Sequence, residues 1–394
     1  MLKYNNKSMN IENLRKEYEL IDLFCSLAEI PSPPLHEEKV AKWLEHYCDM
    51  KDLEFHQDDY GNVYIWVPGN DCSKPTLLLS AHMDVIGDDS PVNLLLDGDF
   101  IKAEGRTLGA DDKAGLAQAL LLAKHLKTMD MPHGGLELVF TRDEESGMSG
   151  IRNTEFCKLR SKYVLVCDSD TLGQLKTAGA SYIKAHIKVK SFKGGHSGID
   201  IHDPERENAV KLIADIVANL PQGVYESKDG EVITSCNLGG IRGGDINVTN
   251  IINTEAEATY SIRSSDKAFE NELIDRMKFE IDDFNKEYDG IAHAQITFET
   301  HLPPFEKIED NYIPLLFEAV AKKVMVQPTI STFHAGAETH IYANEVNSNN
   351  ERFAPYLIGL ASINNMHSAD ENVDYKSMLK GQELLQALFE AYNA

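Results

Sequence analysis

The amino-acid sequence predicts an α/β protein built on a mixed sheet with helices on both faces, with a second, α+β domain inserted into the first. With 394 residues, the chain exceeds the size at which one hydrophobic core usually keeps growing. Short apolar runs alternate with helical patterns over the first 175 or so residues and again after residue 302. Between them, from about residue 180, amphipathic strand patterns alternate with two long helical patterns.

The first domain opens with a helical pattern over residues 36–50. Strand-like apolar runs follow at 62–67, 75–86, 135–141 and 162–168, with a helical pattern at 114–127 among them. Because strands separated by helices form sheets covered by those helices, these segments predict the main sheet. Helix-and-strand alternation resumes at 313–324 and 354–361 and ends in a terminal helix.

The inserted domain shows a different pattern. Residues 181–192, 250–264 and 292–300 alternate as amphipathic strands, and residues 207–220 and 267–288 have helical spacing. This order predicts a four-stranded antiparallel sheet covered by two helices. We therefore expect the first domain at 1–179 and 302–394, and the inserted domain at 180–301.

Charge and composition exclude several classes of partner. The formal net charge is −25, and no stretch is markedly basic. Such a chain repels phosphate backbones and anionic lipid, so we expect neither nucleic-acid nor membrane partners. Hydrophobic residues at 42% and charged residues at 26% are ordinary for a globular protein.

Cysteine usage and hydropathy predict a cytoplasmic protein. The six cysteines are dispersed, without a C-x-x-C pair, as is typical of a reducing compartment. The first 20 residues lack the apolar core of a signal peptide. No run approaches the roughly 18 apolar residues that a transmembrane helix needs.

Potential metal ligands follow three of the apolar runs directly. LLLSAHMD ends in His82 and Asp84, LVFTRDEE in Glu144 and Glu145, and YVLVCD in Asp168. In an open α/β sheet, ligands bind at the carboxyl ends of the strands. Carboxylates and imidazoles clustered there would repel one another or be poorly solvated unless they held cations.

Each pair of these residues also has a simpler explanation when it is taken alone. In an extended segment His82 and Asp84 point the same way, so His82 can bind a metal while Asp84 orients its ring; alone, they are a surface pair. The neighbouring Asp111 and Asp112 precede a helix and could simply cap it. Of two adjacent glutamates, one can bind metal while the other handles protons, but as an isolated motif the pair is weak.

Taken together, six segments in this order resemble the M20 metallopeptidase family, with the peptidase T (tripeptidase) branch as the closest match. They are HMD (82–84), GADDKAG (109–115), DEESG (143–147), VCD (166–168), GGHSG (194–198) and MHSAD (366–370). The resemblance covers nearly the whole chain. It implies a zinc-peptidase catalytic domain at 1–179 and 302–394, with a lid and dimerisation domain at 180–301.

The resemblance also implies a site that holds two metal ions. The implied ligands are His82, Asp111, Glu145, Asp168 and His367. Asp111 would bridge the cations, with His82 and Asp168 on one and Glu145 and His367 on the other. Asp84 would support His82, Glu144 would act as general acid and base, and a cis peptide bond would follow Asp111.

The implied reaction is hydrolysis of the N-terminal peptide bond of a short peptide. Two cations bridged by a carboxylate, about 3.5–4 Å apart, can share a water molecule and lower its pKa towards neutrality. Glu144 would accept the proton of that water and pass it to the departing amine. Because the implied ligands are oxygen and nitrogen only, we expect zinc, with cobalt or manganese as substitutes.

Three residues of the inserted domain are candidates for substrate binding by resemblance. His196 in GGHSG would reach an active site, often that of the partner subunit, and stabilise the oxyanion; alone, it is a structural histidine in a glycine-rich turn. Asn250 and Arg263 match the family's spacing. Arg263 would pair with the terminal carboxylate of a substrate, or form a surface ion pair. A homodimer through this domain is implied.

The segment STFHAGAETHIYAN (331–344) departs from the tripeptidase pattern. Its HAGAE run is similar to the aminoacylhistidine dipeptidases, so His334 is either a substrate contact or a loop histidine. An Xaa-His dipeptidase, a carboxypeptidase or an N-acyl-amino-acid amidohydrolase could use the same metal site. A metal-binding scaffold without activity is disfavoured, because all five ligands and Glu144 are present.

Overall fold

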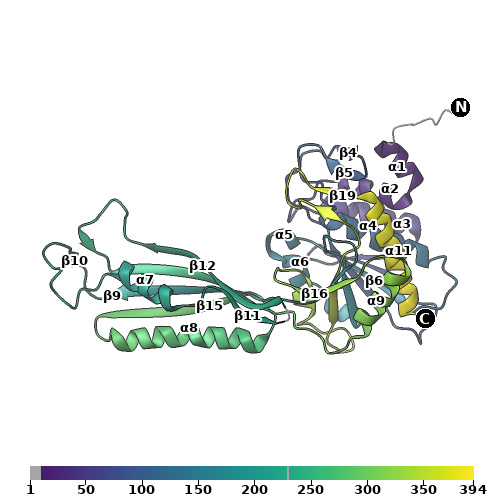
Figure 1. The fold of residues 1–394 in the computed structure, drawn as a ribbon. Coiled ribbons are helices and arrows are strands. Elements are labelled where there is room, and N and C mark those ends of the chain that lie inside the picture. The colour runs from purple at the N-terminus through teal and green to yellow at the C-terminus, as the bar shows by residue number, and fades with distance from the viewer. Residues whose placement is uncertain (1–9, 229) are drawn as a thin grey trace. The chain divides into compact units, whose positions relative to one another are not determined.

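The computed structural model describes residues 10–228 and 230–394, and these fold into two compact units (Figure 1). Unit 1 comprises the described residues up to Thr177 together with Ile308–Ser331 and Ala337–Ala394, and unit 2 comprises those of Ala178–Lys307 and Thr332–Gly336. Each unit has its own cluster of buried hydrophobic side chains. The short segment Thr332–Gly336 belongs to unit 2, although it falls within the range expected for the first domain.

Unit 1 is built on a mixed eight-stranded sheet. In spatial order its strands are β1 (Glu54–Gln57), β2 (Val63–Pro68), β6 (Gly135–Thr141), β3 (Leu77–His82), β7 (Tyr163–Val166), β17 (Ala354–Ile358), β8 (Gln174–Gly179) and β16 (Thr329–Phe333). The central strands β6, β3, β7 and β17 run parallel, while β2 and β8 are antiparallel to their inner neighbours. The predicted α/β class with a mixed sheet is confirmed.

The helices of unit 1 contribute to the same hydrophobic core as the sheet. They are α1 (Ile11–Glu17), α2 (Glu19–Ala28), α3 (Glu38–Lys51), α4 (Ala110–Leu126), α5 (Glu144–Gly147), α6 (Ser149–Arg152), α9 (Tyr312–Lys323), α10 (Thr339–Tyr342) and α11 (Tyr375–Tyr392), with a 3₁₀ turn at Phe156–Lys158. Helix α4 is buried along nearly its whole length, as its apolar residues on every side require. A small sheet, in the order β18 (Ile363–Asn364), β19 (Asn372–Asp374), β5 (Phe100–Ala103) and β4 (Leu94–Asp97), completes the unit.

Unit 2 contains an antiparallel sheet and two helices, as predicted, but the sheet has five strands where the sequence predicts four. Its order is β11 (Gly223–Lys228), β12 (Glu231–Gly243), β14 (Glu255–Ser264), β9 (Tyr182–Ser191) and β15 (Ala292–Leu302). Strands β9, β14 and β15 fall on the three strand patterns of the sequence, whereas β11 and β12, which pair with each other at one edge, fall outside them. Helices α7 (Ala209–Asn219) and α8 (Lys267–Glu287) share a core with the buried residues of the sheet.

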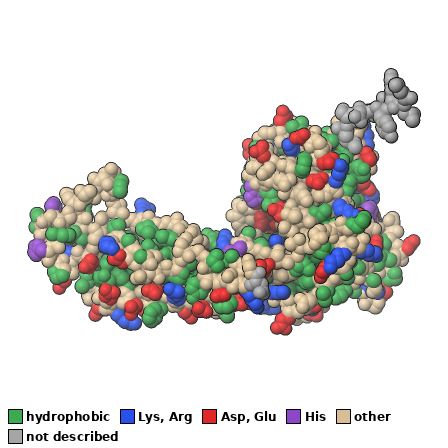
Figure 2. All heavy atoms as spheres, viewed as in Figure 1, with side chains coloured by type: hydrophobic (Ala, Val, Ile, Leu, Met, Phe, Trp, Pro, Cys, Tyr) green, Lys and Arg blue, Asp and Glu red, His purple; other side chains and the backbone are tan. Residues whose placement is uncertain are grey.

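The surface and the helices agree with the composition of the chain. Acidic side chains are scattered over the visible face, with lysine and arginine side chains between them (Figure 2). Among the residues that the structure describes, every helix is too short or too polar to span a membrane. Four of the free cysteines are buried, and Cys72 and Cys157 are exposed.

Candidate metal centre

The candidate site lies in unit 1, where three neighbouring parallel strands end. Strand β3 ends at His82, β6 ends just before the turn that contains Glu144 and Glu145, and β7 ends just before Asp168. Because these strands are parallel neighbours, their carboxyl ends lie along one edge of the sheet. Asp111, from the start of α4, and His367, from the loop between β18 and β19, join them there.

The carboxylate of Asp111 lies at the centre of this cluster. Its Oδ1 is 3.1 Å from Nε2 of His82, and its Oδ2 is 3.1 Å from Nε2 of His367. Nε2 of His82 also lies 3.9 Å from Oδ1 of Asp168, and Nε2 of His367 lies 3.1 Å from Oε1 of Glu145. The two oxygens of Asp111 thus face two separate sets of candidate metal ligands, His82 with Asp168 and His367 with Glu145. The peptide bond between Asp111 and Asp112 is cis, as the resemblance implies.

Asp112 is a further candidate ligand that the motifs do not assign. Its carboxylate groups with His82 and Asp168, just as Asp111 groups with His82 and Glu145, so that each trio could hold a metal ion. Oδ1 of Asp112 accepts the backbone N–H of Gly115 at 3.2 Å, which is a capping contact at the start of the helix. Oδ2 is buried and has no hydrogen-bond partner among the residues described.

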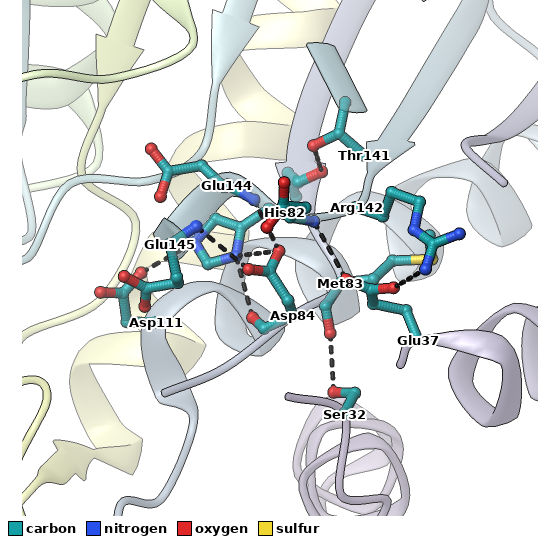
Figure 3. A network of polar contacts seen from close by, with 12 residues as sticks. Ser32, Glu37, His82, Met83, Asp84, Asp111, Thr141, Arg142, Glu144 and Glu145 are labelled. Atoms are coloured by element: carbon teal, nitrogen blue, oxygen red, sulfur yellow. Dashed lines mark hydrogen bonds and ion pairs between the residues drawn. The ribbon is translucent and has the colours of Figure 1, made fainter. Parts of the chain in front are cut away.

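Asp84 holds both the His82 ring and the turn after β6. Nδ1 of His82 donates to the backbone carbonyl of Asp84 at 2.9 Å and lies 3.4 Å from its Oδ1, so Nε2, which faces Asp111, is the ring atom left to bind a cation. The carboxylate of Asp84 accepts the backbone N–H groups of Glu144 and Glu145, each at 3.0 Å (Figure 3). The second of these roles is not visible in the sequence.

Glu37 supports the same turn from the other side. Its buried carboxylate pairs with Arg142 at 2.9 Å (Figure 3). It also accepts the backbone N–H of Asp143 at 3.0 Å. Asp143 has a positive φ of 52°, and its side chain accepts hydrogen bonds from Ser146 and Ser149. The backbone that presents Glu144 and Glu145 is therefore held by carboxylates on both sides.

The burial of so many acidic groups shifts their pKa values. Burial, reinforced by the charges of neighbouring carboxylates, raises the pKa of Glu144 to about 8 and that of Glu145 to about 7. Burial, together with Asp111, raises the pKa of Asp168 well above its usual range. A hydrogen bond to Asp111 raises the pKa of His367 to about 9. Carboxylates and imidazoles crowded in this way fit divalent cations, which would neutralise their charge.

Two of the predicted substrate-binding residues lie together in unit 2. His196 ends the short strand β10 (Gly195–His196), which pairs with β13 (Ile251–Ile252). The carbonyl of Asn250 accepts the backbone N–H of Ser197 at 3.0 Å, so His196 and Asn250 are neighbours, and both are exposed. Asp200 accepts the backbone N–H of His196 at 2.8 Å.

Arg263 and His334 form a second pair within unit 2. Arg263 lies directly opposite Ser235 in the sheet, and the Ser235 hydroxyl is hydrogen-bonded to Nε2 of His334 at 2.8 Å. The Arg263 guanidinium lies over the Tyr182 ring, 4.6 Å from its centroid. Burial and the charge of Arg263 lower the pKa of His334. Asn250 precedes the 10-residue strand β14 and Arg263 is near its far end, so roughly 30 Å separates the two pairs.

Two buried glutamates near the cluster have no role in the motifs. The carboxylate of Glu338 accepts hydrogen bonds from the hydroxyls of Ser80, at 3.2 Å, and Thr141, on the two strands that lead to His82 and Glu144. The carboxylate of Glu371 accepts backbone N–H groups from Gly109, Ala110 and Asp111. The only signals in the sequence are that Glu338 belongs to the HAGAE run and that Glu371 follows His367 by four residues.

A mixed sheet with an inserted α+β unit, and carboxylates and imidazoles gathered at the carboxyl ends of its strands, is the arrangement of a metallopeptidase. Residues 78–391 match the family described as Peptidase family M20/M25/M40. The match covers most of the chain, and the chain belongs to this family.

Individual relatives are more distant. The cytosol non-specific dipeptidase of Escherichia coli strain K12 is 30% identical over 230 residues, which cover 50% of this chain and 46% of that protein. The crystal structure of aminopeptidase PepT from Bacillus cereus ATCC 10987 superposes with a TM-score of 0.85 at 23% identity, covering 95% of this chain and 98% of that one. YXEP from Bacillus subtilis, described as a dinuclear metal binding peptidase, gives 0.70 at 14% identity, covering 94% and 96%. At these identities both structures show the shared fold.

The metal-free protein should lose thermal stability as the pH rises from about 6 to about 9. Glu144 and Glu145 keep protons in the folded state that an unfolded chain releases near its ordinary pKa of 4.5, so their contribution falls as the pH rises. The raised pKa of His367 contributes stability below 6.5, which is lost as the pH rises through about 9. Melting temperatures measured with a chelator across this range check the trend.

Added divalent cation should reverse the trend, because it binds the deprotonated ligands and displaces their protons. The increase in melting temperature on adding zinc should therefore grow with pH, and Glu145→Gln should flatten the metal-free profile. A cation effect of equal size at every pH would contradict the assignment of these groups to the cluster.

Proposed function

We propose that this peptidase is a two-metal aminopeptidase that removes the N-terminal residue from short peptides, tripeptides foremost. The geometry around Asp111 is the observation that supports this most. Its two oxygens each lie 3.1 Å from a histidine nitrogen, and each histidine has a second carboxylate beside it. In this proposal Asp111 would hold both cations, with His82 and Asp168 as the further ligands of one and Glu145 and His367 as those of the other.

Two divalent cations bound there, zinc by preference for these oxygen and nitrogen donors, would supply an activated water and polarise the scissile carbonyl. Glu144 accepts a proton from the attacking water and returns it to the departing amine. Its backbone N–H donates to Asp84, which fixes the turn that presents this carboxylate. Asp84 keeps the His82 ring in the tautomer that can bind a cation.

Arg263 and His334 are the proposed contacts for the C-terminal end of the substrate. A guanidinium presents paired N–H donors that match a carboxylate, and Arg263 has its plane supported by the Tyr182 ring. His334, fixed by Ser235, would add a neutral donor beside it, because its pKa is lowered. A free α-carboxylate is thus the proposed recognition element.

His196 and Asn250 are proposed to act on the substrate of a second subunit. Roughly 30 Å lies between this pair and Arg263 in the same unit 2, so one short peptide cannot contact both pairs of a single chain. We therefore propose a homodimer formed through unit 2, in which His196 stabilises the developing oxyanion across the interface. The free cysteines favour a reducing, cytoplasmic location.

A dipeptidase, including one specific for Xaa-His, is the second candidate. The observation in its favour is His334, which stands in the HAGAE run and lies beside Arg263, where it could select the second residue of a dipeptide. The dipeptidase relative from Escherichia coli supports the same substrate length. A carboxypeptidase and an N-acyl-amino-acid amidohydrolase would use the same metal centre but other ends of the substrate.

An assay of free, N-blocked and C-amidated di-, tri- and tetrapeptides, with products identified by mass, tests these candidates. The protein is first reconstituted with zinc, cobalt or manganese. Release of the N-terminal residue from free tripeptides supports the proposal. Cleavage confined to dipeptides would indicate a dipeptidase. Cleavage confined to N-blocked substrates would indicate an amidohydrolase, and release of the C-terminal residue a carboxypeptidase.

Glu144→Ala should retain both cations and lose turnover by about 10²–10⁴-fold, because it removes the proton carrier and no ligand. Glu145→Ala is the matched control, since it removes the neighbouring carboxylate and should release one cation. Metal content by mass spectrometry and kcat on a tripeptide are measured for both variants. Loss of a cation in Glu144→Ala would reverse the roles of the two glutamates.

Arg263→Ala should raise KM for free tripeptides by about 10–100-fold, the effect of losing a charge-assisted hydrogen-bonded pair. C-amidated tripeptides lack the carboxylate, so their KM should hardly change. Arg242→Ala, an exposed arginine on β12 of the same sheet, serves as the control. Equal effects of Arg263→Ala on both kinds of substrate would exclude the carboxylate contact.

A further inference from the structure

Three consecutive backbone N–H groups converge on a single carboxylate beside the metal centre. Those of Ala110 and Asp111 donate to Oε1 of Glu371 at 2.8 and 3.3 Å, and that of Gly109 donates to Oε2 at 3.0 Å. Glu371 is only 1% exposed. Burying a carboxylate is costly unless its oxygens are hydrogen-bonded, and here donors from one short stretch of backbone satisfy both of them.

The conformation of this stretch depends on Gly109. Its φ of +76° turns successive N–H groups to one side, which makes an anion-binding concavity of the kind called a nest. A Cβ at Gly109 would come within 2.6 Å of Val85 Cγ1, so only glycine fits there. The concavity lies at the irregular start of α4, where Asp111 and Asp112 have non-helical backbone angles. In this protein an internal side chain occupies the concavity.

Glu371 also belongs to the loop that presents His367. It follows His367 by four residues, and its backbone N–H donates to the carbonyl of Ser368 at 3.2 Å, which closes a turn. The Glu371 side chain therefore ties the segment that presents Asp111 to the loop that presents His367. These are the two residues whose side chains meet at 3.1 Å on the Oδ2 side of Asp111.

We propose that Glu371 is a positioning residue of the metal centre, which sets the Asp111 carboxylate and the His367 ring at the separation that a cation between them requires. This inference rests on the proposed metal centre and extends it to a residue that binds neither cation nor substrate. A purely structural role, in which Glu371 only stabilises the start of α4, makes a different prediction. It would affect folding stability without changing how the cations are held.

Substitutions at Glu371, compared with a matched buried glutamate, separate these roles. Glu371→Gln has the same shape and keeps one acceptor oxygen, but turns an NH₂ group towards a backbone N–H; Glu371→Ala leaves all three N–H groups unpaired. The control is Glu137→Gln. Glu137 is also buried in unit 1 and accepts the backbone N–H groups of Arg160 and Ser161, but it lies on β6 near the opposite end of the sheet from the metal cluster.

Three quantities are measured for each variant and for the unmodified protein: the melting temperature without metal, the dissociation constants for Co²⁺ and Zn²⁺, and the absorption spectrum of the Co²⁺-loaded protein. We expect Glu371→Gln to weaken binding of at least one cation by about 10–100-fold and to change the Co²⁺ spectrum. Glu371→Ala should weaken it further. Glu137→Gln should lower the melting temperature while leaving both cation affinities and the spectrum unchanged.

Unchanged affinities and spectrum in Glu371→Gln, with a lower melting temperature, would overturn the positioning role and leave a structural cap. Because Glu371→Gln preserves the shape of the side chain, the test stands even if Glu371→Ala does not fold. An unmodified protein that binds two cations but cleaves no peptide would refute the proposed activity and leave the Glu371 result valid. An unmodified protein that binds no cation would overturn both.

Discussion

The mutual repulsion of carboxylates buried around Asp111 is the constraint on which the rest of the structure depends. The acidic groups divide into two sets by their partners. Asp111 is held by the rings of His82 and His367, whereas Asp84, Glu37 and Glu371 accept backbone N–H groups from the segments that present the central residues. The outer carboxylates thus fix the backbone, and the inner ones are left to face one another and a cation. The ends of the parallel strands and the irregular start of α4 supply the backbone that carries the inner carboxylates and the N–H groups that the outer ones accept.

Periodicity was sufficient to predict the class of the fold and several of its buried strands and helices. The runs that became β3, β6 and β7 are continuously apolar because they are buried on both faces, and β9 and β14 alternate because only one face of their sheet meets the helices. Strand β11 could not be predicted, since its residues Gly223–Lys228 are exposed or half-buried and lack alternation. Only its pairing with β12 makes it a strand. Residues 332–336 belong to unit 2 for a similarly non-local reason. The carbonyl of Phe333 accepts the backbone N–H of Ala180, and the His334 ring is hydrogen-bonded to the Ser235 hydroxyl.

The sequence also identified the residues that meet at the strand ends, because polar ligands that interrupt apolar runs are visible locally. It could not identify the residues that hold them. Glu37 and Glu371 act through backbone N–H groups 106 and about 260 residues away in the chain, and no local pattern encodes such a contact. Nor could it rank Asp111 against Asp112, whose different surroundings follow from the backbone at the start of α4. In unit 2, the pair His196 and Asn250 lies far from the pair Arg263 and His334, because strand β14 runs between them. Sequence spacing alone does not reveal this separation.

The order of strands in the main sheet has a consequence for how the chain is made. Strand β17, Ala354–Ile358, lies between β7 and β8, so the edge of β7 has no partner until nearly the whole polypeptide has left the ribosome. At roughly 5–20 residues per second, the delay between β7 and β17 is on the order of 10–40 s. Unit 2 emerges in that interval and can fold first, while the apolar edge of β7, of the kind that invites aggregation, remains unpaired. Nascent chains stalled before Ala354 therefore expose this unpaired strand edge.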